Sequence, residues 1–239
     1  MPSTEMISVE GLSKTFKLHL MGGTELPVIE AAALSVRAGE CVVLGGPSGV
    51  GKSSILKMIY GNYRADQGSI VVQGESGPLD VVTATPRQIS RLRASTLGYV
   101  SQFLKVIPRI STFDIVRSEM KQTDDVAHAR TRDLLIRLSL PEQLWSLPPA
   151  TFSGGEQQRV NIARGFAADH SILLLDEPTA SLDRHNRDAV IALIREKKAA
   201  GVGILAIFHD EEVRESLADR IVDVKQFAPS LAGHRPLNF

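Results

Sequence analysis

The feature that most constrains this chain is the run Gly46–Ser53, which reads GPSGVGKS. It fits the pattern G-x-x-x-x-G-K-[ST] at every fixed position, and that pattern is typical of loops that cradle phosphate groups. The apolar run Cys41–Leu44 predicts a buried strand just before it, and Ser54–Tyr60 predicts an apolar-faced helix just after it. Strand, glycine-rich loop and helix form the arrangement in which such a loop works.

The residue types explain the chemistry. Glycines let backbone N–H groups approach an anion, and the following helix points its positive end at the same place. Lys52 adds a mobile charge for phosphate oxygens, and the Ser53 hydroxyl is a ligand suited to Mg²⁺. The alternative is a plain glycine-rich turn. We assign phosphate binding to Gly46, Pro47, Ser48, Gly49, Val50, Gly51, Lys52, Ser53 and Ser54.

Composition limits the function classes. Lys and Arg together number 27, as do Asp and Glu, so the net charge is zero. This charge balance disfavours a large electrostatic binding surface for nucleic acid. No apolar stretch approaches the ~20 residues that cross a bilayer. The first residues lack the charged and apolar regions of a secretion signal. We therefore expect a cytoplasmic protein without direct membrane insertion, reaching any membrane through a partner.

The pattern of apolar residues changes along the chain. Residues 6–45 favour strands, with a hairpin tip at Gly22-Gly23, and residues 111–149 favour helices. Thr85, Pro86 and Gln88 are typical of a helix start. The remaining expected elements are strands at 69–72, 79–82, 97–100, 172–175 and 204–208, a helix beginning at 153, and a helix near 187–198.

A second helix end also has the character of an anion site. Ser153 and Glu156 fit a capping box, which is a sufficient structural explanation for those two residues. The glycines between them, Gly154 and Gly155, cost roughly 1 kcal/mol each against alanine in a helix. A helix that needed only a cap would not carry them, so we favour a second phosphate-binding terminus.

A pair of acids follows the apolar run Ile172–Leu175. In open parallel sheets, ligands bind beyond the carboxyl ends of the strands. This places Asp176 near Lys52, where it can hold Mg²⁺ through water, and Glu177 where it can polarise a water molecule for attack on a phosphate. The alternative is a strand followed by an acidic turn.

Together these motifs resemble the ATP-binding-cassette ATPases over almost the whole chain. Gln102 is similar to that family's glutamine loop. The run Phe152–Arg159 is similar to its signature, with Phe152 where Leu is usual and Glu156 where Gln is usual. The resemblance adds three residues: Phe16 to stack on adenine, Asp183 in the loop after the acids, and His209 as the switch histidine.

The resemblance implies a single α/β domain with a P-loop core of mostly parallel sheet. It also implies an N-terminal antiparallel β subdomain and an inserted helical subdomain, with the core at 1–101 and 161–239 and the helical part at 102–160. ATP and Mg²⁺ would lie between the Gly46–Ser53 loop of one subunit and Ser153, Gly154 and Gly155 of another, head to tail. Lys52, Gln102, Glu177 and His209 would be catalytic, and Ser53, Gln102 and Asp176 would attend the metal.

The runs Val100–Ser111, Thr151–Phe166 and Ile207–Glu211 resemble one branch of that family more closely. This branch is the ATP-binding subunit encoded with the bacterial carbon–phosphorus lyase system of phosphonate use. The resemblance implies a homo- or heterodimer with another such subunit, working with the lyase core subunits. Two alternatives stay open: the ATPase subunit of a membrane transporter, and a nucleotide-binding scaffold with little turnover.

Overall fold

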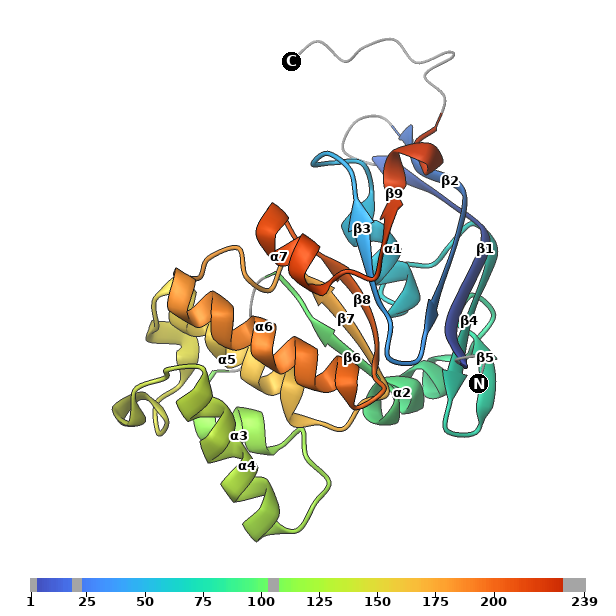
Figure 1. Cartoon of the computed structure of the whole chain (residues 1–239). Coiled ribbons are helices and arrows are strands. Elements are labelled where there is room, and N and C mark those ends of the chain that lie inside the picture. The colour runs from blue at the N-terminus through green and yellow to red at the C-terminus, as the bar shows by residue number, and fades with distance from the viewer. Residues whose placement is uncertain (1–3, 19–22, 103–107, 230–239) are drawn as a thin grey trace.

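The computed structural model describes residues 4–18, 23–102 and 108–229. Two sheets form its centre, and helices pack around one of them (Figure 1). The strands are β1 (Glu5–Leu18), β2 (Thr24–Arg37), β3 (Cys41–Gly45), β4 (Gln67–Gly74), β5 (Gly77–Asp80), β6 (Leu97–Val100), β7 (Ile172–Asp176), β8 (Gly203–Ile207) and β9 (Arg220–Asp223). The α-helices are α1 (Lys52–Ile59), α2 (Pro86–Ser95), α3 (Thr112–Arg117), α4 (Asp124–Arg137), α5 (Gly154–Ala167), α6 (Arg184–Ala199) and α7 (Glu211–Leu217).

The larger sheet is parallel, with the strand order β6-β7-β8-β3-β9. Strands β3, β7 and β8 are buried along their whole length, which explains their continuous apolar runs. Because side chains alternate along a strand, Leu173 and Leu175 join one hydrophobic cluster, and Ile172 and Leu174 join the other. The sheet is therefore covered on both faces.

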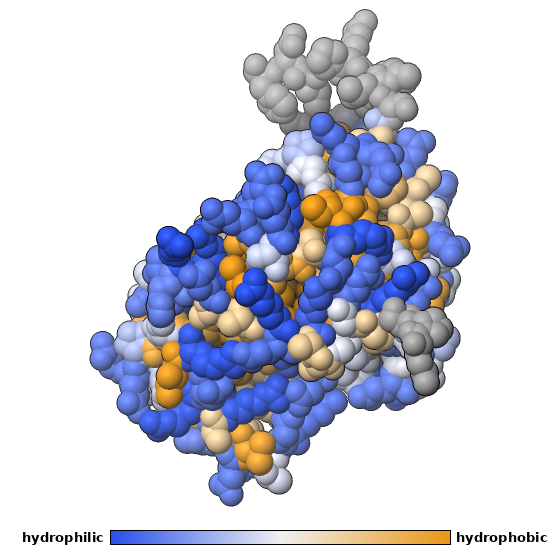
Figure 2. All heavy atoms as spheres, viewed as in Figure 1, coloured by the Kyte–Doolittle hydropathy of each residue, from blue (hydrophilic) through white to orange (hydrophobic). Residues whose placement is uncertain are grey.

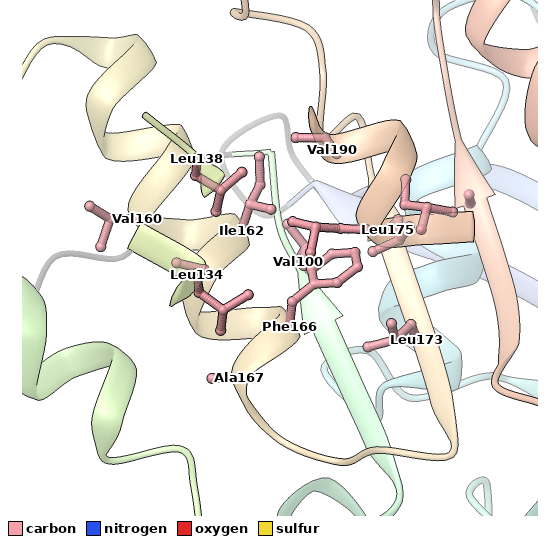
Figure 3. Packing of buried hydrophobic residues seen from close by; sticks show 14 of the residues in the cluster. Val100, Leu134, Leu138, Val160, Ile162, Phe166, Ala167, Leu173, Leu175 and Val190 are labelled. Atoms are coloured by element: carbon pink, nitrogen blue, oxygen red, sulfur yellow. The ribbon is translucent and has the colours of Figure 1, made fainter. Parts of the chain in front are cut away.

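Different elements cover the two faces. Helices α5, α6 and α7 supply the cluster around Leu173 and Leu175, and Figure 3 shows Phe166 and Val190 packed there beside Val100 and Leu175. Helix α1 and strands of the smaller sheet supply the cluster around Ile172 and Leu174. As a result, α1 and α5 lie against opposite faces of the parallel sheet.

The smaller sheet is antiparallel, with the order β2-β1-β4-β5. Strands β1 and β2 pair from Glu5 opposite Arg37 to Leu18 opposite Thr24, as expected for a hairpin. Gly22 of the predicted tip lies outside the described residues, and Gly23 adopts a turn with φ of 80°. The N-terminal β subdomain predicted from the sequence is thus present.

The strand order collects the chemically active residues at one edge. In a parallel sheet all carboxyl ends meet at the same edge. Gln102 follows β6, Asp176 ends β7 and precedes Glu177, His209 follows β8, and the glycine-rich loop follows β3. These four strands are consecutive neighbours in the sheet, so the residues after them share one surface.

The helical part agrees with the change of period after residue 111. Helices α3 and α4 pack against α5, and Leu134, Leu135 and Leu138 are buried as one apolar face of α4. Helix α5 crosses residues 160 and 161, where the sequence predicted the end of the helical subdomain. The division into 1–101 with 161–239 and 102–160 stays a prediction.

Helix termini confirm the local signals in the sequence. Thr85 caps α2 with a capping box to Gln88, and Pro86 occupies the first turn.

Hydrophilic side chains cover most of the face in Figure 2, and hydrophobic ones reach it in separate groups. Among the described residues, no helix combines the length and apolar character that crossing a membrane requires.

Close packing of α5 on β6 gives a stability prediction. A Cβ at Gly165 would lie 2.3 Å from Val100 Cγ2, so Gly165→Ala must displace a buried side chain. We expect this variant to be roughly 1–3 kcal/mol less stable in urea unfolding, as for other overpacked cores. The matched control is Gly154→Ala on the same helix, where a Cβ meets nothing within 4 Å. Equal stability of the two variants would contradict the packing.

Candidate functional site

The glycine-rich loop presents an uncapped helix end. Gly51 is the N-cap of α1 with φ of 103°, a left-handed conformation that favours glycine, and no side chain caps the helix. The first turn of α1 carries no acidic residue. The first N–H groups of a helix have no partner within the helix, so this end can bind an anion.

Lys52 holds this loop in shape. Its Nζ donates to the carbonyl oxygens of Gly46 and Pro47, both at 2.7 Å, and the residue is 8% exposed. Its ammonium group therefore spans the loop from inside. An arriving phosphate would find the positive charge already positioned, and the two carbonyl bonds would be exchanged for bonds to phosphate oxygens.

Ser53 and Asp176 form a pair suited to Mg²⁺. Ser53 Oγ donates to Asp176 Oδ1 at 2.9 Å, and Asp176 is only 3% exposed. A hydroxyl and a carboxylate are the hard oxygen donors that this ion prefers. The residues therefore fit the predicted metal.

Tyr99 adds a second donor to the same carboxylate. Its hydroxyl donates to Asp176 Oδ2 at 3.0 Å, and burial together with the Asp176 charge raises the pKa of Tyr99, so that the hydroxyl keeps its proton. The sequence analysis did not find this residue. The sequence shows an aromatic residue near the end of a predicted strand. Its link to Asp176 follows only once it is known that this strand is the neighbour of the strand that carries Asp176.

Glu177 is held from both sides. His209 Nε2 lies 2.7 Å from Glu177 Oε1, and Gln102 Nε2 donates to Oε2 at 3.2 Å. Glu177 itself has φ of 54°, unusual for a residue with a side chain, and its N–H donates to the Ile207 carbonyl. The backbone at Glu177 thus turns the carboxylate toward its partners on neighbouring strands.

The environment of His209 is also fixed. Asp210 pairs with Arg187 of α6 and caps α7, which anchors the loop that carries His209. A hollow of about 300 Å³ is bordered by Glu177, His209 and Asp210. This hollow leaves room for small molecules such as water beside the Glu177 carboxylate.

The second predicted anion site lies at the start of α5. Ser153 forms the capping box with Glu156: Ser153 Oγ donates to Glu156 Oε2 at 2.7 Å and the Ser153 N–H donates at 2.8 Å. The capping box and the glycines are both present, so this segment is compatible with a plain helix cap and with a second phosphate-binding terminus. Gly155 lies near the next loop, with the position of a Cβ 3.4 Å from the Ser181 carbonyl oxygen.

Gly154 lies in open space at the start of α5. Its φ is not in the left-handed region, and a Cβ there would meet nothing within 4 Å. Among the described residues, neither backbone conformation nor packing requires a glycine at 154. The role of this helix end as a second anion site stays a prediction.

Phe16 and Asp183 occupy separate places. Phe16 lies on β1 with its ring edge-to-face against Tyr63, at 5.3 Å between centroids, and Lys14 Nζ lies 5.4 Å from the Phe16 ring. Tyr63 was not predicted from the sequence. Asp183 is the N-cap of α6 and bonds the Asn186 backbone and side chain, which lowers its pKa.

The chain brings together only part of the predicted site. Lys52, Ser53, Asp176, Glu177, Gln102 and His209 share the carboxyl edge of the parallel sheet. Ser153 and Gly154 begin a helix on the face opposite α1. Within the described residues, no hydrogen bond joins the two helix ends. That the start of α5 binds a triphosphate held by the loop of a second subunit stays a prediction.

Comparisons with known proteins agree with this architecture. Residues 29–180 match the protein family described as "ABC transporter". The chain is 36% identical to lipoprotein-releasing system ATP-binding protein LolD 2 of Caulobacter vibrioides, covering 93% of this chain and 96% of that protein. It is 31% identical to macrolide export ATP-binding/permease protein MacB 2 of Aeromonas hydrophila, over 93% of this chain but 34% of that protein.

A solved structure is similar in fold. The dimeric post-hydrolysis structure of the ATP-binding cassette MJ0796, bound to ADP and Pi, superposes with a TM-score of 0.81. The sequence identity is 24%, and the match covers 92% of this chain and 95% of that one. The likeness confirms the predicted fold class of a P-loop core with an antiparallel β subdomain and helices around the parallel sheet.

The capping box of α5 gives a prediction on pH. The Ser153 hydroxyl and then its N–H hold the pKa of Glu156 below the usual 4.5. A lowered pKa in the folded state stabilises the protein above pH 4.5, and this contribution is lost as the pH falls through the folded value. We expect Glu156→Gln to melt below the unmodified protein at pH 7, with the difference shrinking below pH 4.5.

The control for that series is Glu10→Gln, which removes a charge from an exposed position on β1 without touching a helix cap. Calorimetric melting of all three proteins from pH 7 to 3 checks the prediction. A difference between Glu156→Gln and the unmodified protein that stays constant across this range contradicts it.

Proposed function

The chain belongs to the ABC transporter family, and from this premise we propose that it is an Mg²⁺-dependent ATPase whose complete site forms between two ATP-binding subunits. The observation that carries the proposal is the carboxyl edge of the parallel sheet, where the phosphate loop, the Ser53–Asp176 pair and Glu177 lie together. Members of this family bind ATP with Mg²⁺.

The phosphate loop binds the triphosphate. The N–H groups at the uncapped start of α1 and the Lys52 ammonium group face the same anion, which neutralises charge on its outer phosphates. Phe16, half-exposed on β1, would stack on the adenine ring, with Tyr63 packed against the edge of Phe16. These contacts orient the nucleotide along the edge of the sheet.

Ser53 and Asp176 would hold the metal ion. Mg²⁺ bound there supplies positive charge that stabilises the phosphate oxygens as the terminal bond breaks. Ser53 would offer its hydroxyl oxygen to the ion, and Asp176, the buried carboxylate that accepts a hydrogen bond from Ser53, would attend the same ion. Gln102, the other predicted metal residue, bonds Glu177 in this structure.

Glu177 orients the attacking water. Its carboxylate accepts hydrogen bonds from Gln102, and His209 Nε2 lies in hydrogen-bonding contact with its other oxygen. A carboxylate fixed in this way can accept a proton from water that attacks the terminal phosphate. His209 is 53% exposed at its side chain, so it can also reach the terminal phosphate from the sheet edge.

The second subunit completes the site from outside. Its Ser153 hydroxyl and the N–H groups near Gly154 would face the terminal phosphate, where the open space at Gly154 admits the ligand. Ser153 would exchange its bond to Glu156 for one to phosphate. Removing the terminal phosphate removes what both helix ends bind, so hydrolysis would open the dimer.

The nature of the partner follows from the relatives. Those named above are a lipoprotein-releasing ATP-binding protein and a macrolide-export protein that unites ATP-binding and permease parts. Neither is named for phosphonate breakdown, so the transporter alternative is better supported than the phosphonate interpretation. We infer that the chain works as the ATP-binding subunit of a membrane transporter, at the cytoplasmic face of the membrane.

A small apolar surface supports docking to such a partner. Ile110 is 39% exposed and Leu147 is 44% exposed, and the Leu147 carbonyl accepts a hydrogen bond from the Thr112 N–H at the start of α3. Ile110 follows β6 by ten residues, and Leu147 is brought to the start of α3 by that hydrogen bond. By resemblance to transport members of the family, the segment Phe103–Ser111 would meet the membrane partner, and its residues 103–107 lie outside the described residues.

A second candidate is the carbon–phosphorus lyase assembly. Two runs favour it, Val100–Ser111 and Ile207–Glu211. They resemble that branch, and most of their residues lie outside the ATP-binding motifs that the whole family shares. The two candidates share the ATPase chemistry and differ in the partner. Integral-membrane permeases are expected in the first case, and the lyase core subunits in the second.

Glu177→Gln tests the catalytic proposal. This variant keeps the size of the side chain and its hydrogen-bonding atoms but removes the proton acceptor, so we expect ATP turnover to fall at least about 100-fold. ATP should still bind and should now trap a stable dimer, measured by light scattering after gel filtration. Lys52→Ala, which removes the loop ammonium group, should neither bind ATP tightly nor dimerise. Unchanged turnover in Glu177→Gln would remove Glu177 from this role.

The same trapped dimer tests the second anion site. Gly154→Asp, added to Glu177→Gln, should leave the subunit folded, since position 154 is open space in one chain. It should abolish the ATP-dependent dimer, because a carboxylate would then face the partner's phosphate. Ala129→Asp, which adds the same carboxylate at an exposed position of α4 without a left-handed backbone, is the control and should dimerise normally. A full dimer with Gly154→Asp would contradict the role of this helix end.

Native capture tests the partner. The chain, tagged at its own locus, is purified with ATP from detergent-solubilised membranes and, in parallel, from the membrane-free fraction, and its co-purified proteins are identified. Integral-membrane permease subunits in stoichiometric amount are the expected result. Carbon–phosphorus lyase subunits in the membrane-free fraction would overturn the transporter proposal and establish the second candidate.

A further inference from the structure

We propose that Tyr99 is a positioning residue for the metal site, holding the Asp176 carboxylate in the orientation that receives Mg²⁺. The inference rests on the proposed function, since it concerns the same ATP and Mg²⁺ site. It is carried by the hydrogen bond from the Tyr99 hydroxyl to Asp176 Oδ2, which joins residues 77 positions apart in the sequence.

The sheet register explains why this bond forms. In the parallel pair β6–β7, Tyr99 lies opposite Leu174, two residues before Asp176. Side chains two apart on a strand share a face, so Tyr99, Leu174 and Asp176 point to the side that α1 covers. Two residues of a strand span about 6.6 Å, and a tyrosine side chain is about that long. The hydroxyl therefore reaches forward along the strand to the carboxylate.

The tyrosine ring is itself fixed. Tyr60, at the C-terminus of α1, stacks on Tyr99 with ring centroids 4.9 Å apart. Arg93 of α2 lies on Tyr60, with its guanidinium carbon 4.3 Å from the ring centroid, and its Nε donates to the Tyr60 carbonyl at 2.9 Å. A side chain held in this way transmits a defined orientation to Asp176.

The two donors to Asp176 differ in what metal binding does to them. Ser53 donates to Oδ1 and is itself a proposed ligand of the ion, so the metal would help to set the orientation of this donor. Tyr99 donates to Oδ2 and is not a proposed ligand. Of these two donors, Tyr99 is therefore the one that orients the carboxylate independently of the metal. Groups that orient a metal ligand in this way commonly change metal affinity 10- to 100-fold when removed.

The test compares two hydroxyl deletions within the same stack. In a Glu177→Gln background, which does not turn over, ATP binding is measured by calorimetry across a Mg²⁺ titration and again with EDTA. Tyr99→Phe keeps the ring stack and removes the hydroxyl. We expect its Mg²⁺ midpoint to rise roughly 10-fold, with metal-free ATP affinity unchanged. Tyr60→Phe, the control, should match the parent in both.

A structural readout separates positioning from simple stabilisation. Thermal unfolding of both variants is measured without nucleotide. A lower melting temperature for Tyr99→Phe with the parent's Mg²⁺ midpoint would overturn the inference and leave Tyr99 a packing residue. The same rise in midpoint for Tyr60→Phe would overturn it as well, because the effect would then belong to the stack. A parent that shows no Mg²⁺-dependent ATP binding would instead refute the proposed function.

Discussion

The order of four parallel strands is the constraint on which the site depends. Strands β6, β7, β8 and β3 lie side by side, and the residues after them are Gln102, Glu177, His209 and the phosphate loop. None of these residues is close to its partners in the sequence. Each is brought to the shared edge because a parallel strand must be followed by a crossover that returns to the opposite end. Exchanging β8 and β3, for example, would keep every motif in the sequence and would place a strand between those that carry Glu177 and His209.

The two helix ends that face phosphate are prepared differently. Helix α1 has no side-chain cap, so its N–H groups are available in the single subunit. Helix α5 is capped by Ser153 and Glu156, so its serine hydroxyl is already engaged. Phosphate binding to the first N–H groups of α1 therefore displaces no capping side chain. Phosphate binding to the Ser153 hydroxyl at α5 must displace the Glu156 carboxylate. In the proposed mechanism this difference would order the events: nucleotide would bind first to the loop of one subunit, and the α5 end of the other would close on it afterwards.

Local signals in the sequence predicted local structure well. The caps at Thr85 and Ser153, the strand–loop–helix around Lys52 and the acid-terminated strand at Asp176 all depend on residues a few positions apart, and the structure confirms them. The missed residues are the aromatic ones. The three tyrosines of the chain contact one another or residues of the predicted site: Tyr60 stacks on Tyr99, Tyr99 donates to Asp176, and Tyr63 packs on Phe16. Each contact is set by strand order or by the segment after α1. Nor does a pattern of apolar residues predict the left-handed backbone at Glu177, which depends on the hydrogen bond from its N–H to β8. The finer resemblance to the carbon–phosphorus lyase branch is not supported by the relatives reported above, which are named for lipoprotein release and macrolide export.

The functional side chains of the single subunit all have partners within it. Lys52 bonds two loop carbonyls, Ser53 bonds Asp176, Glu177 contacts Gln102 and His209, and Ser153 bonds Glu156. Buried polar groups without partners are costly, so these bonds stabilise the fold before any nucleotide arrives. They also hold each donor close to the place where the ligand needs it. Nucleotide binding is then an exchange of hydrogen bonds with little net change in their number, and its driving force comes from the charge of the triphosphate and from closure against the second subunit. In the proposed mechanism a single subunit supplies only one half of the site, so closure of the dimer would depend on bound ATP.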